Sequence, residues 1–318
     1  MRLLVIGGTV FLGRHVAEEA VRRGHEVTLF HRGRHGDDLL AGRAEHLLGD
    51  RTGDLGALAG RSWDAAIDTC GFEPGPVARS SALEIGHLVF VSSISAYPGW
   101  PEEHVDEDSL VWSEEIDDYG SLKVACERAA EAARAGRVAI VRAGLLCGPY
   151  DNIARLSWWI ERVAAGGDVL APGAPGRELQ LVDARDLAAW MVHLAERGEA
   201  GTFNGTAPRG QTTMGAVLET AIAATGSDAR LHWRADDALV AAGVQPWSDL
   251  PLWLPGPGTW TVGTERAHAA GLRCRPVAEA VADTWAWMRS GEPLSDYRAQ
   301  MRPDGLGRER EAQLLAGA

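Results

Sequence analysis

The chain has 318 residues, 46% of them hydrophobic, which is enough for a sizeable core and for about two domains. Its formal net charge of −13, from 31 Lys and Arg against 44 Asp and Glu, repels polyphosphate backbones, so we expect no nucleic-acid partner. The apolar runs are far shorter than the roughly 18 residues that cross a membrane, and the first residues lack a signal-peptide pattern. We therefore expect a cytoplasmic protein without membrane contact.

Short apolar runs alternate with segments of helical period through the first half of the chain, a pattern typical of βαβ units around a parallel sheet. We predict strands over residues 2–6, 26–30, 45–48, 65–69, 87–92 and 137–142, and helices over 11–23, 74–84 and 117–135. The predicted fold class is α/β: a Rossmann-type doubly wound parallel sheet with a smaller C-terminal α/β part that binds substrate.

The pattern becomes less regular after residue 150. Residues 1–150 are the predicted dinucleotide-binding domain, to which residues of about 178–205 can return, and residues 151–318 are mainly the substrate-binding part. Further pieces are predicted as a helix around 158–163, a strand over 178–182, a helix from Asp183 to about Glu196, and strands or helices over 201–204, 212–225, 230–234 and 276–289. Asp183 can cap the helix that follows it. The polar tail after Ser290 is either a docked arm or frayed.

The first strand leads directly into a glycine-rich turn, Gly7 to Gly13, and then into a helix. Glycines at such a turn let the backbone approach a pyrophosphate at the helix N-terminus, where free N–H groups favour anions. A tight connection without a ligand is the alternative. Val10 stands where the spacing G-x-x-G-x-x-G has a glycine, so we expect this loop to bend slightly differently.

After the second strand comes His31-Arg32-Gly33-Arg34, where an acidic residue would otherwise hold the ribose 2′-hydroxyl. Guanidinium groups suit a 2′-phosphate, so NADP(H) is favoured, with NAD(H) as the alternative cofactor. A solvated basic turn would have the same composition. Asp50 is expected to reach the adenine amino group, and Thr69-Cys70-Gly71 ends the fourth strand beside the cofactor. The four cysteines form no metal-ligand pattern, so we expect no metal.

Tyr119 and Lys123 are four residues apart and therefore share one face of a predicted helix. A nearby ammonium favours the phenolate, so the tyrosine pKa is expected to be lowered. The pair alone is a weak signal and could be a surface pair. Its weight comes from the order along the chain: a phosphate loop, a serine after the fifth strand, then Tyr and Lys.

In this order the sequence resembles the extended short-chain dehydrogenase/reductase family, the NAD-dependent epimerase/dehydratase group. The resemblance continues through residues 141–149, 180–188, 201–204 and 270–276. The G-G-T-x-F-L-G-R form of the loop is similar to an atypical branch of the family that includes plant plastid RNA-associated proteins.

This resemblance implies that Tyr119 exchanges a proton with a substrate hydroxyl or carbonyl. It also implies that Lys123 binds the nicotinamide ribose and lowers the tyrosine pKa, and that Ser93 hydrogen-bonds the substrate oxygen. Sugar-nucleotide 4,6-dehydratases of the family carry Asp-Glu after that serine, whereas this chain has Ile94-Ser95, so dehydratase chemistry is disfavoured. The cofactor-binding residues predicted in total are Gly7, Thr9, Val10, Phe11, Leu12, Gly13, His31, Arg32, Arg34, Asp50, Arg51, Thr69, Cys70, Gly71, Ser92, Tyr119 and Lys123.

The substrate-binding residues are expected to come from the segments 100–115, 151–159, 174–180 and 245–260. The candidates are Ser95, Trp100, Trp158, Arg177, Trp247 and Trp253. At most one of the adjacent Trp158 and Trp159 is expected to face a ligand. Arg177 could bind a diphosphate or carboxylate, or lie at the surface, and His104 and Glu114 are further acid/base candidates. The three-proline segment 245–255 is either a wall of the pocket or an ordinary packed loop.

Three functions remain open from the sequence. One is an oxidoreductase or epimerase acting at a secondary alcohol or ketone of a sugar nucleotide or polyol. Another is an NADPH-dependent reductase of a small specialised metabolite. The last is a non-catalytic dinucleotide-sensing or RNA-associated protein, against which the retained Ser93, Tyr119 and Lys123 count. The expected partner is a small-molecule substrate, and a homodimer is left open.

Overall fold

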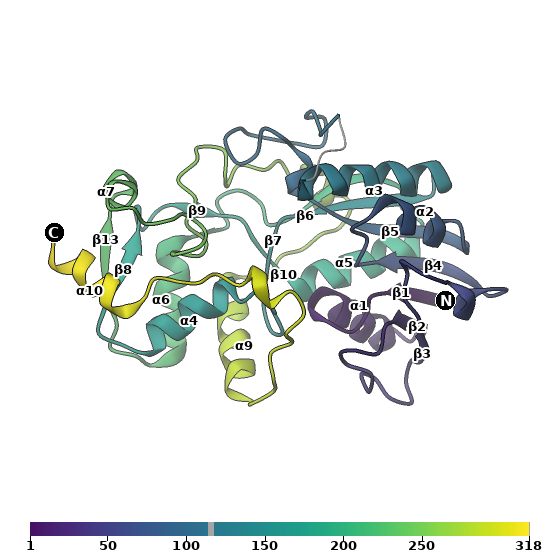
Figure 1. Cartoon of the computed structure of the whole chain (residues 1–318), viewed down its shortest axis with the longest axis horizontal. Coiled ribbons are helices and arrows are strands. Elements are labelled where there is room, and N and C mark those ends of the chain that lie inside the picture. The colour runs from purple at the N-terminus through teal and green to yellow at the C-terminus, as the bar shows by residue number, and fades with distance from the viewer. Residues whose placement is uncertain (114–117, 318) are drawn as a thin grey trace.

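A seven-stranded parallel sheet forms the centre of one half of the molecule (Figure 1). The computed structural model describes residues 1–113 and 118–317. The strands are β1 (Arg2–Ile6), β2 (Glu26–His31), β3 (Glu45–Leu48), β4 (Ser62–Asp68), β5 (Glu84–Ser93), β6 (Val138–Ala143) and β11 (Gly201–Gly205). Their order is β11-β6-β5-β4-β1-β2-β3. The predicted doubly wound α/β fold is confirmed, because the chain leaves β1 toward β2 and β3 and then crosses to β4 on the other side of β1.

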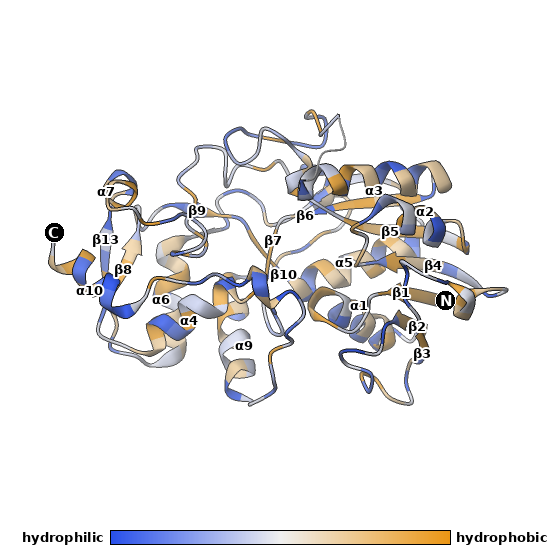
Figure 2. Ribbon diagram, in the orientation of Figure 1, coloured by the Kyte–Doolittle hydropathy of each residue, from blue (hydrophilic) through white to orange (hydrophobic). Residues whose placement is uncertain are grey.

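Helices cover both faces of this sheet because successive side chains of a strand point to opposite faces. In β1, Leu3 and Val5 belong to the core under α1 (Phe11–Arg22) and α5 (Ala184–Arg197). Leu4 and Ile6 belong to the core under α2 (Pro74–Ser81) and α3 (Tyr119–Ala133). Figure 2 shows the resulting hydrophobic strands between helices of mixed hydropathy.

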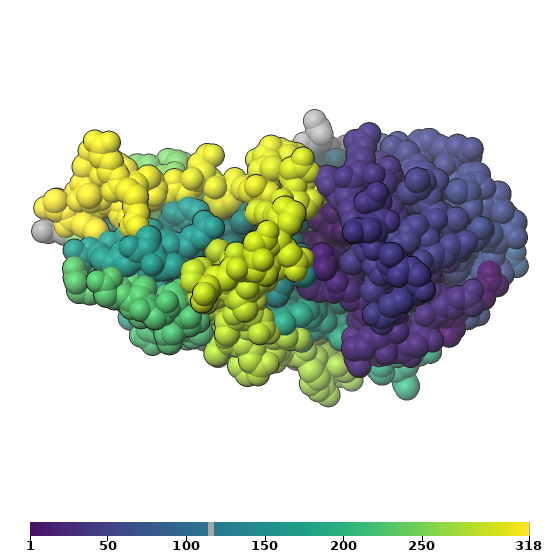
Figure 3. Space-filling view, turned by 90° about the horizontal axis from the view of Figure 1, so that it is seen from below, coloured from purple at the N-terminus to yellow at the C-terminus, as the bar shows by residue number. Residues whose placement is uncertain are grey.

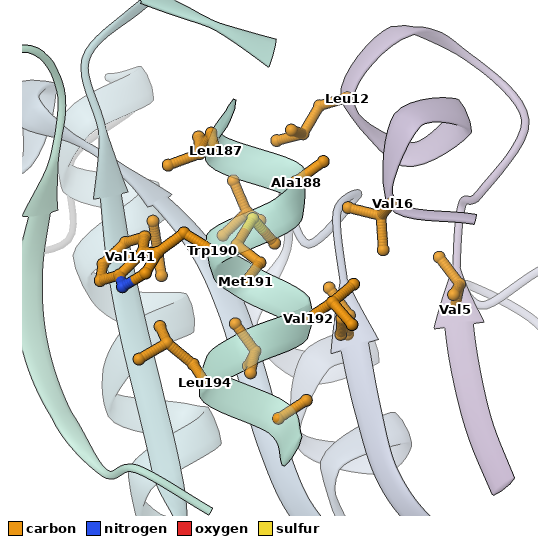
Figure 4. Close-up of a cluster of buried hydrophobic side chains, with 14 of the residues drawn as sticks. Val5, Leu12, Val16, Val141, Leu187, Ala188, Trp190, Met191, Val192 and Leu194 are labelled. Carbon is orange, nitrogen blue, oxygen red and sulfur yellow. The ribbon is translucent and has the colours of Figure 1, made fainter. Parts of the chain in front are cut away.

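Residues 184–205 return to the first half of the chain. Helix α5 packs against α1, and Figure 4 shows its Leu187, Ala188 and Met191 in a buried cluster that also contains Leu12 and Val16 of α1. Asp183 caps α5 by accepting a hydrogen bond from the N–H of Arg185 (2.9 Å), as the sequence predicts. Strand β11 then extends the sheet beside β6, a seventh strand that the first half of the sequence does not supply.

The other half of the molecule has a core of its own. Helices α4 (Arg155–Ala164), α6 (Met214–Thr225) and α9 (Val277–Arg289) pack against one another there. The short strands form pairs: β8 (Asp168–Pro172) with β13 (Arg230–Arg234), β7 (Leu145–Cys147) with β10 (Leu181–Asp183), and β9 (Glu178–Leu179) with β12 (Thr212–Thr213). The remaining helices are α7 (Asp236–Ala241), α8 (Glu265–Ala269), α10 (Arg308–Ala316) and the 3₁₀ turns Gly56–Leu58, Ile94–Ala96 and Ala299–Met301. The strand predicted over 178–182 is thus two strands, β9 and β10, with different partners.

A C-terminal arm, residues 291–307, connects α9 to α10 and contacts both halves. Glu292 accepts a hydrogen bond from the hydroxyl of Tyr150 (3.1 Å) and lies 3.8 Å from the guanidinium of Arg14 in α1. Further along, Arg302 donates to the carbonyl of Asn152 (2.9 Å). Figure 3 shows the yellow arm between the purple N-terminal residues and the teal ones. The tail is therefore a docked arm. Across the two described stretches, no helix is long and apolar enough to cross a membrane.

A buried ion pair anchors the far end of this tail. Glu311 of α10 is 4% exposed, and its carboxylate lies 2.8 Å from Nε of Arg162 in α4. The same carboxylate accepts a hydrogen bond from the N–H of Leu170 in β8 (3.0 Å). Helix α10 is thus held to the second core by charge as well as by apolar contacts.

We expect Glu311→Gln to lower the free energy of unfolding by roughly 3–5 kcal/mol, because it leaves the buried Arg162 charge without its partner. Urea unfolding measures this change. The matched control is Glu309→Gln, which alters an exposed residue of the same helix and should be nearly neutral. Equal stability of the two variants would contradict the anchoring role of Glu311.

Candidate active site

A cavity of about 800 Å³ lies at the carboxyl ends of the central strands, and both halves of the molecule line it. The loop after β1, the ends of β2, β4 and β5, and the start of α3 contribute from the first half. The start of α4, the loop around Trp247 and the C-terminal arm contribute from the second. In open α/β sheets such a crevice is where ligands bind.

The glycine-rich turn brings the backbone close to the cavity. Gly7 has a positive φ of 92°, and a Cβ atom there would lie 2.8 Å from the sulfur of Cys70. A Cβ atom at Gly13 would lie 2.8 Å from the carbonyl oxygen of Gly7. Val10 is extended and precedes α1 without a side-chain cap, and Phe11 takes a positive φ of 42°, which is how the loop bends without a glycine at position 10. This cradle fits a dinucleotide pyrophosphate, since the first N–H groups of α1 face no capping side chain.

Two histidines fix the start of the basic turn after β2. The N–H of Gly33 donates to Nδ1 of His31 (3.1 Å), so Nε2 of His31 donates to Nδ1 of His46 (2.8 Å). His46 in turn donates to the carbonyl of Leu39 (2.8 Å). Burial, and then the proximity of His46, lower the pKa of His31, which keeps this ring neutral. His31 borders the cavity, but both of its ring nitrogens serve the loop.

Arg32 and Arg34 extend from that turn to the cavity and are exposed. Asp50 lies opposite them, and its carboxylate accepts hydrogen bonds from the N–H and hydroxyl of Thr52 (2.9 and 2.8 Å). These bonds, together with the two guanidinium charges, lower the pKa of Asp50. Two exposed cations at this end of the cavity suit a phosphate.

Arg51 lies deeper in the same wall. It donates to Asp68 (2.7 Å) and to the hydroxyl of Ser80 (2.8 Å), and its Nη1 lies 3.6 Å from the sulfur of Cys70. Its charge is therefore largely neutralised by the protein, unlike those of Arg32 and Arg34. Burial raises the pKa of Cys70 to about 11, so this thiol is not a nucleophile at neutral pH.

The serines at the end of β5 have different surroundings. The hydroxyl of Ser92 donates to the buried carboxylate of Glu127, which also receives two hydrogen bonds from Arg142 (3.0 and 2.8 Å). The hydroxyl of Ser93 accepts from the N–H of Ser95 (3.1 Å) and is hydrogen-bonded to Tyr119. Both serines border the cavity, but only Ser93 is in contact with the tyrosine.

Tyr119 is the first residue of α3 because Asp118 caps the helix, accepting a hydrogen bond from the N–H of Gly120 (2.8 Å). The tyrosine lines the cavity and is 42% exposed. Desolvation by the cavity walls raises the pKa of its phenol, and the charge of Arg298 and the hydrogen bond with Ser93 offset only part of that rise. The predicted lowering of this pKa is therefore wrong for the protein alone.

Lys123 lies one turn further along α3 and is 3% exposed. Its ammonium donates to the carbonyls of Gly71 and Val91, each at 2.6 Å, and faces the ring of Phe90 at 4.7 Å. Burial lowers the pKa of Lys123 to about 8. Because these carbonyls hold the ammonium, the cations that act most on Tyr119 are Arg298 and then Arg155.

Most predicted site residues border this cavity. They are Gly7, Thr9, Val10, Phe11, Leu12, Gly13, His31, Arg32, Arg34, Asp50, Arg51, Thr69, Cys70, Ser92, Ser93, Ser95, Trp100, Tyr119, Lys123 and Trp247. Gly71 does not line the cavity, but its carbonyl accepts a hydrogen bond from the ammonium of Lys123. Glu114 lies outside the described residues, and the imidazole of His104 hydrogen-bonds the carbonyl of Thr261 away from the cavity.

Three substrate candidates lie elsewhere and are corrected. Trp253 is fully buried in the second core and donates to Asp236 (2.8 Å). Arg177 pairs with the same Asp236 and donates to the carbonyl of Leu254 (3.1 Å). Trp158 packs edge-on against Trp159, with ring centroids 4.8 Å apart, at the edge of the second core. Of the segment 245–255, Trp247 and Leu254 line the cavity, so the loop is a wall on one side and packed core on the other.

Sequence reasoning missed several cavity residues. Asp151, Asn152 and Arg155 stand in a segment expected near the substrate, but nothing in their pattern distinguished them. Phe72, Tyr297, Arg298 and Met301 also line the cavity. The last three come from the C-terminal arm, whose polar composition gives no sign that it returns to the site.

The family model described as the NAD dependent epimerase/dehydratase family matches residues 77–205. That segment contains Ser93, Tyr119 and Lys123. Residues 77–205 belong to the epimerase/dehydratase family. For this segment the predicted family is confirmed, and the description of that family as NAD dependent agrees with the prediction of an NAD(P)-dependent enzyme. No curated protein matches the sequence.

Solved structures of epimerase/dehydratase type share the fold along nearly the whole chain. The Bordetella bronchiseptica enzyme WbmH, in complex with NAD⁺, has a TM-score of 0.68 at 15% identity, with 92% of this chain and 99% of that one covered. A Bacillus cereus UDP-glucuronic acid 4-epimerase in complex with NAD has a TM-score of 0.66 at 14% identity, covering 94% and 98%. A human epimerase family protein with NADPH has a TM-score of 0.61 at 21% identity, covering 90% and 99%.

We expect Ser92→Ala to lower the free energy of unfolding by roughly 1–3 kcal/mol, because the buried Glu127 carboxylate loses a hydrogen bond that no water replaces. Ser93→Ala serves as the matched control and should have a smaller effect, because its partners border the open cavity. Urea unfolding of both variants measures the difference. Equal losses would contradict the separate roles of these two hydroxyls.

Proposed function

We propose that this chain is an NADP(H)-dependent oxidoreductase or epimerase that acts at a secondary alcohol or ketone, with Tyr119 as the acid/base. The observation that supports this most is that Ser93, Tyr119 and Lys123 border the same cavity as the Gly7–Gly13 turn. A nicotinamide dinucleotide, when bound, supplies a hydride acceptor or donor. The chain supplies the proton transfer, the positioning of the reacting oxygen and the exclusion of water.

The hydroxyl groups of Ser93 and Tyr119 are hydrogen-bonded to each other at the cavity wall, so one substrate oxygen can reach both. In a reduction, Tyr119 donates its proton to the carbonyl oxygen that is becoming an alkoxide, while Ser93 holds that oxygen. A phenol with a raised pKa remains protonated at neutral pH, which suits the donor role. Lys123 positions this helix turn through its two carbonyl contacts and keeps a positive charge near the developing oxyanion.

The NADP(H) preference is supported by Arg32 and Arg34, which are exposed at one end of the cavity. A 2′-phosphate there would meet two guanidinium groups and no acidic ribose ligand at the end of β2. This observation favours the reductase form of the proposal over the epimerase form, because NADPH usually serves reduction. The substrate is proposed as a polyol, a sugar nucleotide or a small specialised metabolite that carries the reacting ketone.

Tyr119→Phe should lower the turnover number roughly 10²–10⁴-fold, because the proton donor is lost while the aromatic ring stays. The assay follows NADPH oxidation with a ketone that the wild-type protein reduces, and NADPH binding is titrated separately. NADPH affinity is the internal control and should be retained in Tyr119→Phe, because the substitution removes only the phenol hydroxyl. Wild-type turnover in Tyr119→Phe would reject the assignment of Tyr119.

Replacing both Arg32 and Arg34 by Ala should weaken NADPH binding about tenfold or more, because charge-assisted bonds to the 2′-phosphate are lost. NADH binding should change little, since NADH lacks that phosphate. Fluorescence titration with both cofactors measures this, and Arg43→Ala, an exposed arginine outside the cavity wall, is the matched control. Equal loss for NADPH and NADH would remove the claim of NADP(H) preference.

A further inference from the structure

Arg155 places a guanidinium group in the cavity wall, and the nearest carboxylate that acts on its charge is that of Asp151. It is the first residue of α4, lines the cavity, and lies with its guanidinium carbon 4.4 Å from the centroid of the Trp247 ring. Within the described residues, its side chain has no hydrogen bond or ion pair. The Asp151 carboxylate, which is 2% exposed, attracts the guanidinium of Arg155 electrostatically, but it accepts a hydrogen bond from the N–H of Ile153 (3.0 Å) and not from that side chain.

A second guanidinium group near the tyrosine comes from the C-terminal arm. Arg298, in the C-terminal arm, lies 4.6 Å from the Phe72 ring centroid and 5.9 Å from the ring centroid of Tyr119. It too lines the cavity, and within the described stretches of chain its side chain donates no hydrogen bond. Both guanidinium groups line the same cavity as Tyr119 and act electrostatically on its phenol, so both cations lie near the proposed proton donor.

Stacked guanidinium groups keep their N–H donors free in the plane of the group, where a carboxylate or phosphate accepts two bonds at once. Two such groups in a partly dry cavity are costly without an anion between or beside them. The diphosphate of the cofactor is expected at the Gly7–Gly13 turn, on α1, whereas Arg155 belongs to α4. Arg177, the other arginine considered for an anion, is already neutralised by Asp236.

We propose that Arg155 and Arg298 bind an anionic group, a carboxylate or phosphate, that the substrate carries close to its reacting carbonyl. This inference rests on the proposed function, since it takes the position of Tyr119 to indicate where the reacting carbonyl of the substrate binds. It narrows the substrate class from any ketone to an acidic one. Trp247 would hold the guanidinium of Arg155 in a fixed plane, which selects flat, two-oxygen groups over single hydroxyls.

Benzoate and benzamide are suitable probes because they share a shape and differ in charge. We expect the NADPH-loaded wild-type protein to bind benzoate about tenfold or more tightly than benzamide by isothermal titration calorimetry, as a charge-assisted pair predicts. That preference should fall toward unity in Arg155→Met and also in Arg298→Met. The matched control is Arg289→Met, because Arg289 also stacks on a tryptophan, Trp285 at 6.0 Å, but lies outside this cavity.

The outcomes of these titrations distinguish a failure of the proposed anion site from a failure of the proposed function. Failure of the wild-type protein to bind NADPH would overturn the proposed function itself. NADPH binding with equal affinity for benzoate and benzamide, or an unchanged preference in folded Arg155→Met, would overturn only the anion site. A tenfold loss of NADPH affinity in Arg155→Met would assign this guanidinium to the cofactor phosphates and also overturn it. Thermal unfolding of each variant shows that it is folded, and Arg298→Met, on the surface arm, tests the same site from an independent element.

Discussion

The ammonium group of Lys123 is the contact on which the geometry of the site depends. A buried cation must be solvated by the protein, and here the carbonyls of Gly71 and Val91 do this at 2.6 Å each. One carbonyl follows β4 and the other lies in β5, so α3 is held at the carboxyl ends of two neighbouring strands. Ser93 comes two residues after Val91, and Tyr119 lies one helical turn before Lys123. The two hydroxyls meet because the lysine fixes both elements.

A second buried charge extends this constraint to the edge of the sheet. Glu127, one turn after Lys123, pairs with Arg142 of β6 at 2.8 Å, and Arg142 donates to the hydroxyl of Tyr97 (2.9 Å). Tyr97 in turn donates to Asn204 of β11 (2.8 Å). The last strand of the sheet, which comes late in the chain, is thus hydrogen-bonded to the same network that holds Ser92, the neighbour of Ser93. Because each member is buried and satisfied by the next, the arrangement has little freedom to relax.

The alternation of apolar runs with segments of helical period was sufficient to predict the strands and helices in the first half of the chain. The strands at 2–6 and 45–48 have the predicted bounds because apolar runs between turn signals end sharply. The order of loop, serine, tyrosine and lysine located the cavity wall, since the carboxyl ends of parallel strands meet at one edge. The prediction failed where the position of a side chain depends on a single partner that lies far away in the sequence. Trp253 donates a hydrogen bond to Asp236 and Arg177 forms an ion pair with it, and no local sequence pattern predicts either contact. The role of Arg298 could not be predicted for the same reason, because only the folded arm brings its guanidinium near the ring of Tyr119.

The docking of the C-terminal arm has a consequence for biosynthesis. The glycine-rich turn leaves the ribosome before the other parts of this cavity, and the strands of the sheet can pair while later residues are still being made. Tyr297 and Arg298, however, follow every strand of that sheet in the chain, and α10, which follows them, must still reach Arg162. One wall of the cavity therefore closes only after the arm and α10 have been synthesised. A nascent chain would have its glycine-rich cradle well before it has a finished chamber for a substrate.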